Sequence, residues 1–147
     1  MNRYFKQTIF LMGVSAFLLA GCSESEWNES EIFESGDFQM LGEENLIGFI
    51  YDDSEVTRFY PNKEQKYMWH LWGDDLNGAF NVIATKEGTD EEIEIFQSTS
   101  SSGEHNGADA SLPSTMSLPE TGMWKLDAYV NDSLHGSVFV KVHEEAG

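Results

Sequence analysis

The chain has 147 residues, of which 26 are acidic and 8 are lysine or arginine, and its formal net charge is −18 at pH 7. An acidic surface repels the phosphate backbone of nucleic acids, so a nucleic-acid partner is not expected. The only cysteine, Cys22, cannot form an intramolecular disulfide, so an apolar core must stabilise the fold.

Residues 1–21 are predicted to be a signal peptide. Arg3 and Lys6 give the segment a basic start, and an apolar run of twelve residues follows from Ile9 to Ala20. This run is too short for a membrane-spanning helix, which needs about 20 apolar residues. Its length is typical of the apolar part of an export signal.

The end of the apolar run reads Leu19-Ala20-Gly21-Cys22. This tetrad resembles the lipobox of bacterial lipoproteins, in which the leader is cut before the cysteine and the thiol carries a diacylglycerol. The resemblance implies cleavage of the Gly21–Cys22 bond and lipidation of Cys22, which accounts for an unpaired cysteine in an exported protein. Two acyl chains hold a protein stably on a bilayer, so we expect it at the extracytoplasmic face of the cell membrane. The alternatives are a plain signal peptide followed by a free thiol, or a buried core helix.

Residues 22–37 are predicted to be an acidic, flexible stalk. The leader contains two of the 8 basic residues and no acid, so residues 22–147 have 6 basic and 26 acidic residues and a formal charge of −20. Eight of the acids and none of the bases lie between Ser23 and Glu44. Such a segment repels itself and stays extended and solvated. A cation-binding acidic strip is the alternative interpretation.

Residues 38–147 are predicted to form one all-β domain, because short apolar or alternating runs are separated by segments rich in Gly, Asn, Asp and Pro. A long loop is expected at residues 101–114. The spacing of the runs predicts an antiparallel sandwich or barrel. The stronger strands are expected at Leu46–Tyr51, Lys66–Trp72, Phe80–Thr85, Glu92–Gln97, Met123–Val130 and Leu134–Val142, and weaker ones at Gln39–Leu41, Thr57–Tyr60 and Thr115–Leu118.

The last two predicted strands form a β-hairpin, because apolar residues alternate on both sides of the turn sequence "NDS". The preceding sequence "SLPETGMW" resembles the corner before the penultimate strand of immunoglobulin-like domains, with Trp124 in the place of the usual tyrosine. We therefore expect the Trp124 indole to pack rather than to make the usual backbone hydrogen bond. The resulting fold prediction is an immunoglobulin-like antiparallel β-sandwich.

Three sequences together, "YMWHLWG", "GADASLPSTMSLPETGMWKLDAYVNDSLHGSVFVKV" and the lipobox, resemble a group of small lipoproteins of Bacillus-type bacteria. The resemblance covers most of residues 38–142, and its motifs are structural rather than catalytic. It implies an immunoglobulin-like domain at the cell surface and no particular biochemical activity.

The histidines at positions 70, 105, 135 and 143 lack the close spacing of a zinc site. His135 and His143 would lie about 26 Å apart on one extended strand, so they cannot share a metal. No Gly-x-Ser-x-Gly or Ser-x-x-Lys motif is present. We expect a protein without catalysis, cofactor or metal, and a pair of acids that cleaves glycosides is the alternative.

The sequences "YDDSE" at 51–55 and "DDLNG" at 74–78 are typical of turns. Calcium prefers carboxylate and carbonyl oxygens, so one ion could bridge these two acidic loops at one end of a sandwich. A calcium-dependent envelope protein is therefore the alternative function.

The strand at 66–72 offers the clearest binding surface. Tyr67, Trp69 and Leu71 alternate with Met68, His70 and Trp72, so the two sets lie on opposite faces. If Met68, His70 and Trp72 are exposed, they form a patch for a ligand or partner. The alternative is that loops cover this face.

Two further aromatic residues, Phe139 and Tyr129, point outward on the closing hairpin and would extend the patch if their strands share its sheet. The predicted function is a membrane-anchored binding or accessory module for an envelope protein or small ligand.

Overall fold

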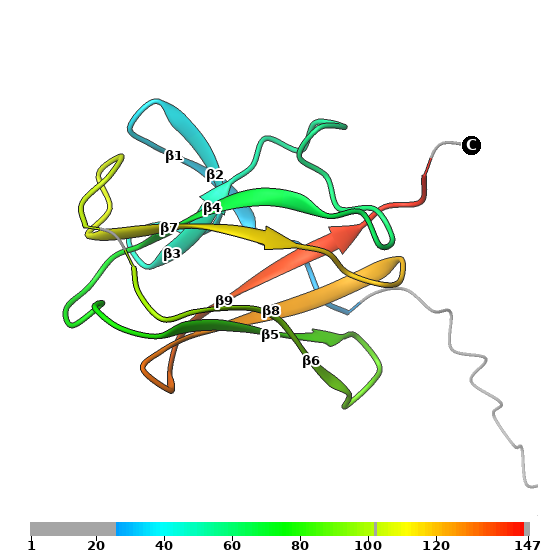
Figure 1. Ribbon diagram of the computed structural model, residues 1–147. Helices are drawn as coiled ribbons and strands as arrows, with labels where there is room; N and C mark the ends of the chain where they lie inside the picture. The colour runs from blue at the N-terminus through cyan, green and yellow to red at the C-terminus, as the bar shows by residue number, and fades with distance from the viewer. Residues whose placement is uncertain (1–25, 102, 146–147) are drawn as a thin grey trace, which may run out of the picture.

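The computed structural model describes residues 26–101 and 103–145 (Figure 1). The predicted leader, the Gly21–Cys22 bond and the start of the predicted stalk lie outside the described residues. Within the described part, no helix is long and apolar enough to cross a membrane.

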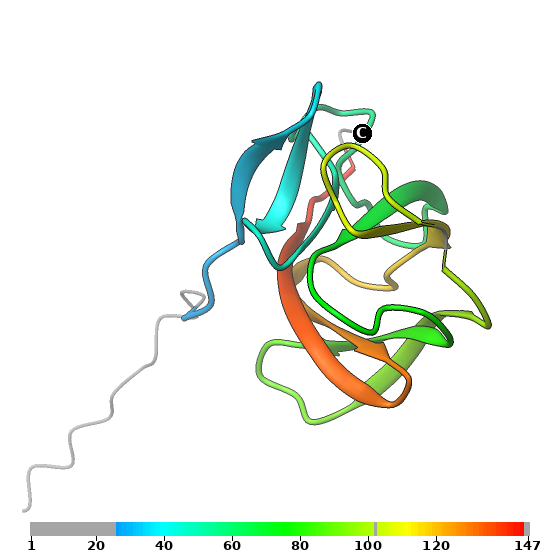
Figure 2. The same ribbon diagram turned by 90° about the vertical axis from the view of Figure 1, so that its left-hand side faces the viewer.

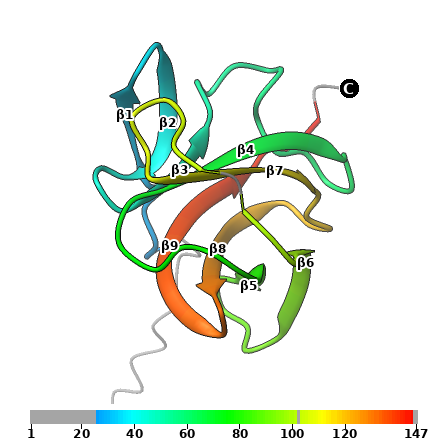
Figure 3. The same ribbon diagram turned by 60° about the vertical axis from the view of Figure 1, so that its left-hand side comes forward.

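In the described residues, nine strands form two antiparallel sheets that pack face to face (Figures 1 and 3). The first sheet has the order β1-β2-β3-β4-β7 and consists of β1 (Glu31–Ser35), β2 (Phe38–Glu43), β3 (Ile47–Ile50), β4 (Gln65–Leu71) and β7 (Ala110–Met116). The second has the order β6-β5-β8-β9 and consists of β5 (Phe80–Lys86), β6 (Glu92–Ser98), β8 (Gly122–Val130) and β9 (Ser133–Val142). The predicted antiparallel β-sandwich is confirmed.

The core lies between the sheets and is built around an aromatic cluster. Phe49 of β3 contacts Trp69 and Tyr67 of β4, with ring centroids 5.0 and 5.1 Å apart. Trp69 is fully buried and reaches Phe80 of β5 in the other sheet, at 5.5 Å. Tyr67, Trp69 and Leu71, which the alternating sequence of this strand places on one face, are therefore the residues that face the core.

The closing hairpin has the predicted turn. Asn131 and Asp132 have φ angles of 48° and 66°, and the flanking residues Val130 and Ser133 pair directly. Two successive residues with positive φ are typical of a type I′ turn, which matches the twist of the strands it joins.

The corner before β8 differs from the expectation. The buried Trp124 indole Nε1–H donates a hydrogen bond of 2.9 Å to the carbonyl of Glu120. The prediction that this indole packs without a backbone hydrogen bond is therefore wrong. A buried indole N–H needs an acceptor, and the carbonyl four residues earlier supplies it.

The folded domain begins before residue 38, so the stalk boundary at residue 37 is corrected. β1 pairs with β2 over Glu31–Ser35, and the ring of Phe33 lies against Gly48, where an added Cβ would meet Phe33 Cζ at 2.9 Å. Residue 30 already belongs to the fold: Ser30 N–H donates to the carbonyl of Phe139 at 3.0 Å, beside β9 (Figure 2).

The weak strand predicted at Thr115–Leu118 covers only the end of β7, whose residues 110–114 fall in the predicted loop at 101–114. β7 contains Pro113, which lacks a backbone N–H. β7 is the last strand of its sheet, and an edge strand tolerates proline because one side of it needs no ladder hydrogen bond. The weak strand expected at 57–60 is reduced to an isolated bridge between Phe59 and Val142.

Candidate functional site

The predicted patch on β4 is covered. His70 is fully buried, and Met68 and Trp72 are half-buried. Residues 103–109 and β1 cover this face: Trp72 Nε1–H donates to the carbonyl of Gly107 at 2.9 Å, and the ring of Phe33 lies 5.9 Å from that of Trp72. Met68, His70 and Trp72 therefore do not form the exposed surface that was expected.

His70 instead holds the covering loop. Its Nδ1 lies 3.0 Å from the carbonyl of Met68, and its Nε2 lies 3.1 Å from the side-chain amide of Asn106. A carbonyl can only accept, so we assign the proton to Nδ1, and Nε2 then accepts from the amide. Burial lowers the pKa of His70, consistent with a neutral ring.

The outward aromatic residues of the closing hairpin, Tyr129 and Phe139, belong to β8 and β9 in the second sheet. They cannot extend a surface on β4, which lies in the first sheet.

The two acidic loops proposed to share calcium lie at opposite ends of the sandwich. In the antiparallel pair of β3 and β4, Ile47 pairs with Leu71 and Phe49 with Trp69. The 51–55 loop follows β3 and the 74–78 loop follows β4, so the chain leaves the pair in opposite directions. One ion cannot bridge them. The described residues also contain no group of three His, Cys, Asp or Glu side chains that could hold a metal.

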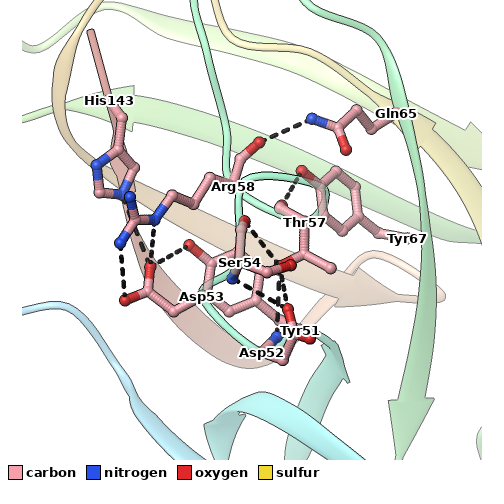
Figure 4. A network of polar contacts seen from close by, with 9 residues as sticks. All are labelled: Tyr51, Asp52, Asp53, Ser54, Thr57, Arg58, Gln65, Tyr67 and His143. Atoms are coloured by element: carbon pink, nitrogen blue, oxygen red, sulfur yellow. Dashed lines mark hydrogen bonds and ion pairs between the residues drawn. The ribbon is translucent and has the colours of Figure 1, made fainter. Parts of the chain in front are cut away.

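Two carboxylates of the 51–55 loop, those of Asp52 and Asp53, have protein partners (Figure 4). Asp52 accepts hydrogen bonds from Ser54 N–H at 3.0 Å and from the Thr57 hydroxyl at 2.7 Å. Hydrogen bonding with the side chain of Ser54, followed by that with the side chain of Thr57, lowers the pKa of Asp52. Asp53 accepts from Nε and Nη2 of Arg58 at 2.9 and 3.4 Å, and this hydrogen bonding holds the pKa of Asp53 below its usual value.

A cavity of about 520 Å³ lies between this loop, the corner before β8 and the end of β9. It was not anticipated from the sequence. It is lined by Glu55, Arg58, Tyr60, Thr121, Gly122, Lys141, Val142, His143 and Glu144.

Several nitrogen groups around the cavity have hydrogen-bonding capacity that the described chain does not use. Arg58 has five N–H donors and gives two of them to Asp53. Lys141 forms no ion pair with a described carboxylate. His143 Nε2 lies 3.8 Å from Asp53 Oδ1, too far for a hydrogen bond, and burial is the main cause of its lowered pKa.

A smaller hollow adjoins the cavity and shares Glu55 and Tyr60 with it. The ammonium of Lys63 lies over the ring of Tyr60 there, 5.2 Å from the centroid. Arg58, Lys63 and Lys141 are three of the 6 basic residues between positions 22 and 147. Basic residues are scarce in this chain, and half of those that follow the leader lie here. Their positions are the one signal in the sequence that could have indicated this end of the sandwich as a binding site.

The N-terminal segment passes beside the cavity. The Glu87 carboxylate accepts hydrogen bonds from Glu26 N–H at 3.1 Å and Trp27 N–H at 2.8 Å, and Glu87 N–H donates to the carbonyl of Met123 at 2.9 Å. Burial, followed by the charge of Asp53, raises the pKa of Glu29. The chain therefore enters the fold at the end of the sandwich that contains the cavity.

The chain belongs to the family described as "Domain of unknown function (DUF4871)", whose model matches residues 17–140. Among solved structures, it is similar to the crystal structure of a putative lipoprotein from Bacillus anthracis, with 25% sequence identity and a TM-score of 0.63 over 80% of this chain and 86% of that one. It also matches a superoxide reductase (neelaredoxin) from Ignicoccus hospitalis, with 12% identity and a TM-score of 0.42 over 68% of this chain and 80% of that one. None of the curated proteins matches the sequence significantly. The first two matches support the resemblance to a lipoprotein family without an assigned role, and the immunoglobulin-like detail stays a prediction.

Proposed function

We propose that the protein is a lipoprotein anchored through Cys22 at the extracytoplasmic face of the cell membrane, with a non-catalytic β-sandwich that binds a ligand of the envelope. The lipobox supports the anchor, as does the similarity to the Bacillus anthracis protein. The cavity beside β9 supports the binding role.

The observation that carries the binding role is the set of unpaired donors around this cavity. Its volume of about 520 Å³ lies within the roughly 300–1,000 Å³ typical of small-molecule sites. Arg58 and Lys141 line it from two different elements, the 51–58 loop and β9. Asp53 fixes the guanidinium of Arg58 in advance, and pre-organised donors lose less entropy when a ligand binds.

The entry of the chain into the fold supports a position close to the bilayer. Trp27 is held by Glu87 and packs on Phe139, with ring centroids 5.4 Å apart. Five residue steps separate it from Cys22, which span at most about 18 Å when fully extended. A lipid on Cys22 would therefore hold the cavity end of the sandwich near the membrane, and no long stalk would separate them.

The order of the strands supports the immunoglobulin-like assignment. If β3 to β9 are lettered A to G, strands A, B and E share one sheet and C, F and G share the other, as in immunoglobulin domains. The remaining strand, D (β6), pairs with C (β5), whereas in immunoglobulin domains strand D pairs with E (here β7). Trp124 hydrogen-bonds the carbonyl of Glu120, upstream, as the corner tyrosine of those domains does.

The anchor is tested by labelling cells with a fatty acid and separating membranes from soluble protein. The wild-type chain should carry label and stay with the membranes, whereas Cys22→Ala should lose both. Label on Cys22→Ala, or none on the wild type, would contradict the anchor.

The binding role is tested by native mass spectrometry of the acylated protein extracted from membranes. A small-molecule adduct should be present on the wild type and on Lys66→Gln, and absent from Lys141→Gln. Lys66 is a suitable control because it also lacks an ion pair with a described carboxylate and does not line the cavity. An adduct that survives in Lys141→Gln would contradict the assignment of the site.

A further inference from the structure

We propose that the cavity beside β9 binds a phosphate ester of a small polyalcohol, the group that glycerol phosphate represents. This inference rests on the proposed binding role and specifies the ligand class of that site.

Half of the basic residues that follow the predicted leader gather at this end. The part of the chain that follows the predicted leader has a formal charge of −20. Even so, Arg58, Lys63 and Lys141 gather around the cavity and the adjoining hollow, whose linings also contain Glu55, Glu144 and Glu145. Neither lysine forms an ion pair with these or other described carboxylates. An acidic chain offers many partners for a lysine, so lysines without them are available to a ligand.

The donor types favour a tetrahedral oxyanion. Arg58 has guanidinium N–H groups that Asp53 does not use, Lys141 adds an ammonium, and Thr121 adds a hydroxyl from the corner before β8. Arginine suits phosphate because its planar fork donates to two oxygens at once, while lysine acts as a point charge. A phosphoryl group offers three oxygens, which is enough to accept from these three kinds of donor.

The acidic residues of the lining favour an ester over the bare ion. Glu55 and Glu144 are exposed and lie on the walls of the same cavity. Carboxylates repel inorganic phosphate, but they accept hydrogen bonds from alcohol hydroxyls. A phosphate attached to a hydroxylated carbon chain satisfies both the cationic and the acidic groups.

The position of the cavity identifies a nearby source of such a group. The N-terminal segment enters the fold beside the cavity, through Glu26 and Trp27 on Glu87. Anchorage at Cys22, within about 18 Å of Trp27, brings the cavity close to phospholipid headgroups, which are phosphate esters of glycerol. Soluble glycerol phosphate has the same chemistry, so lipid and soluble sources are separated by experiment.

The test is calorimetric titration of the acylated protein, in a phosphate-free detergent, with glycerol 1-phosphate. We expect saturable binding, about tenfold weaker in Lys141→Gln and unchanged in Lys66→Gln. Glycerol and inorganic phosphate should bind at least tenfold more weakly than the ester. The Lys141 side chain is exposed on β9, and an unchanged melting temperature of Lys141→Gln would show that the variant folds.

Three results would overturn the proposal: no saturable heat with the ester, equal affinity of Lys141→Gln and the wild type, or equal weakening by Lys66→Gln. If the native mass spectra show an adduct that depends on Lys141 but the ester does not bind, the ligand class is wrong and the binding role stands. If both fail, the site itself is wrong.

The two sources are distinguished by repeating the titration in lipid discs. Phospholipid discs should weaken the apparent affinity for glycerol 1-phosphate, compared with discs of phosphate-free glycolipid, if headgroups occupy the cavity. Equal affinity in both kinds of disc would assign the cavity to soluble esters.

Discussion

The backbone N–H of Trp27 donates a hydrogen bond of 2.8 Å to the carboxylate of Glu87, sixty positions further along the chain. The same carboxylate accepts from Glu26 N–H, and the Trp27 ring meets Phe139 edge-on. An acid-rich segment that composition alone assigns to a free stalk is thereby attached to the second sheet. A carboxylate in the turn after β5 thus contributes, with the contacts of Phe139, to fixing the segment that precedes β1.

Replacing Glu87 by alanine should loosen this attachment. Both N–H groups would lose a charged acceptor, and we expect a cost of about 1 kcal/mol, because the site is partly exposed to solvent. Amide hydrogens of residues 26–30 should exchange faster, and the melting temperature should fall by roughly 3 °C. Glu91→Ala, in the same turn, is the matched control and should change neither quantity. Unchanged exchange in Glu87→Ala would show that Trp27 and Phe139 hold the segment without the carboxylate.

The contribution of the corner hydrogen bond to stability can be measured by comparing two buried tryptophans, Trp124 in β8 and Trp69 in β4. Trp124→Phe removes the indole N–H that donates to Glu120, whereas the indole N–H of Trp69 has no hydrogen-bond partner in the described chain. Both substitutions remove the same ring volume from a buried site. We therefore expect urea unfolding to show a cost larger by about 1 kcal/mol for Trp124→Phe than for Trp69→Phe. Equal costs would mean that the corner hydrogen bond contributes no net stability.

Most strands could be predicted because one face of each is buried and apolar residues then alternate, as in β4, β8 and β9. β1 could not be, because its two apolar residues, Ile32 and Phe33, are adjacent and do not alternate with polar ones, and the contacts of Phe33 with Gly48 and Trp72 are distant in sequence. β7 was obscured by Pro113, whose tolerance depends on the strand lying at a sheet edge, which no local pattern reveals.

The candidate sites show the same limit. The pattern of β4 correctly separated Met68, His70 and Trp72 from the core face, but burial of that second face depends on a loop thirty and more residues away. The cavity was missed for a similar reason. Its donors Arg58 and Lys141 lie far apart in the chain, and the backbone contacts of Phe59 with Val142 and His143 bring the loop of Arg58 beside β9.

The buried imidazole of His70 should make stability depend on pH. Burial lowers the pKa of His70 in the folded state from 6.5, whereas the unfolded chain takes up the proton near that value. The contribution of the neutral ring is therefore complete above about pH 6.5 and is lost as the pH falls towards the folded pKa. The free energy of unfolding, measured in urea between pH 7.5 and 5.5, should fall less steeply in His70→Gln, in which the amide can still pair with Met68 and Asn106.

The loop that His70 holds gives an independent measurement. Protonation of Nε2 removes the acceptor for the Asn106 amide, so amides of residues 103–109 should exchange faster at pH 5.5 than at pH 7.5, after correction for intrinsic rates. His143, whose pKa burial also lowers, lies at the other end of the sandwich, beside the cavity, and should not affect this loop. If exchange in the loop is independent of pH, or if His70→Gln keeps the full slope, the imidazole does not control the loop.

The attachment of Trp27 also predicts how the sandwich stands on a membrane. β9 has ten residues and is therefore about 33 Å long at ~3.3 Å per residue, which is enough to separate its two ends by energy transfer. With Cys22 acylated, an introduced cysteine is the only free thiol, and a dye can be placed at Glu91→Cys near the anchored end or at Ser133→Cys in the far turn. Transfer to an acceptor at the bilayer surface should be stronger from position 91 than from position 133. Inserting ten Gly and Ser residues between Ser25 and Glu26 should lower both signals and reduce their difference, because a flexible chain no longer fixes orientation. Equal transfer from the two positions without the insertion would show that the bond between Trp27 and Glu87 does not orient the domain at the membrane.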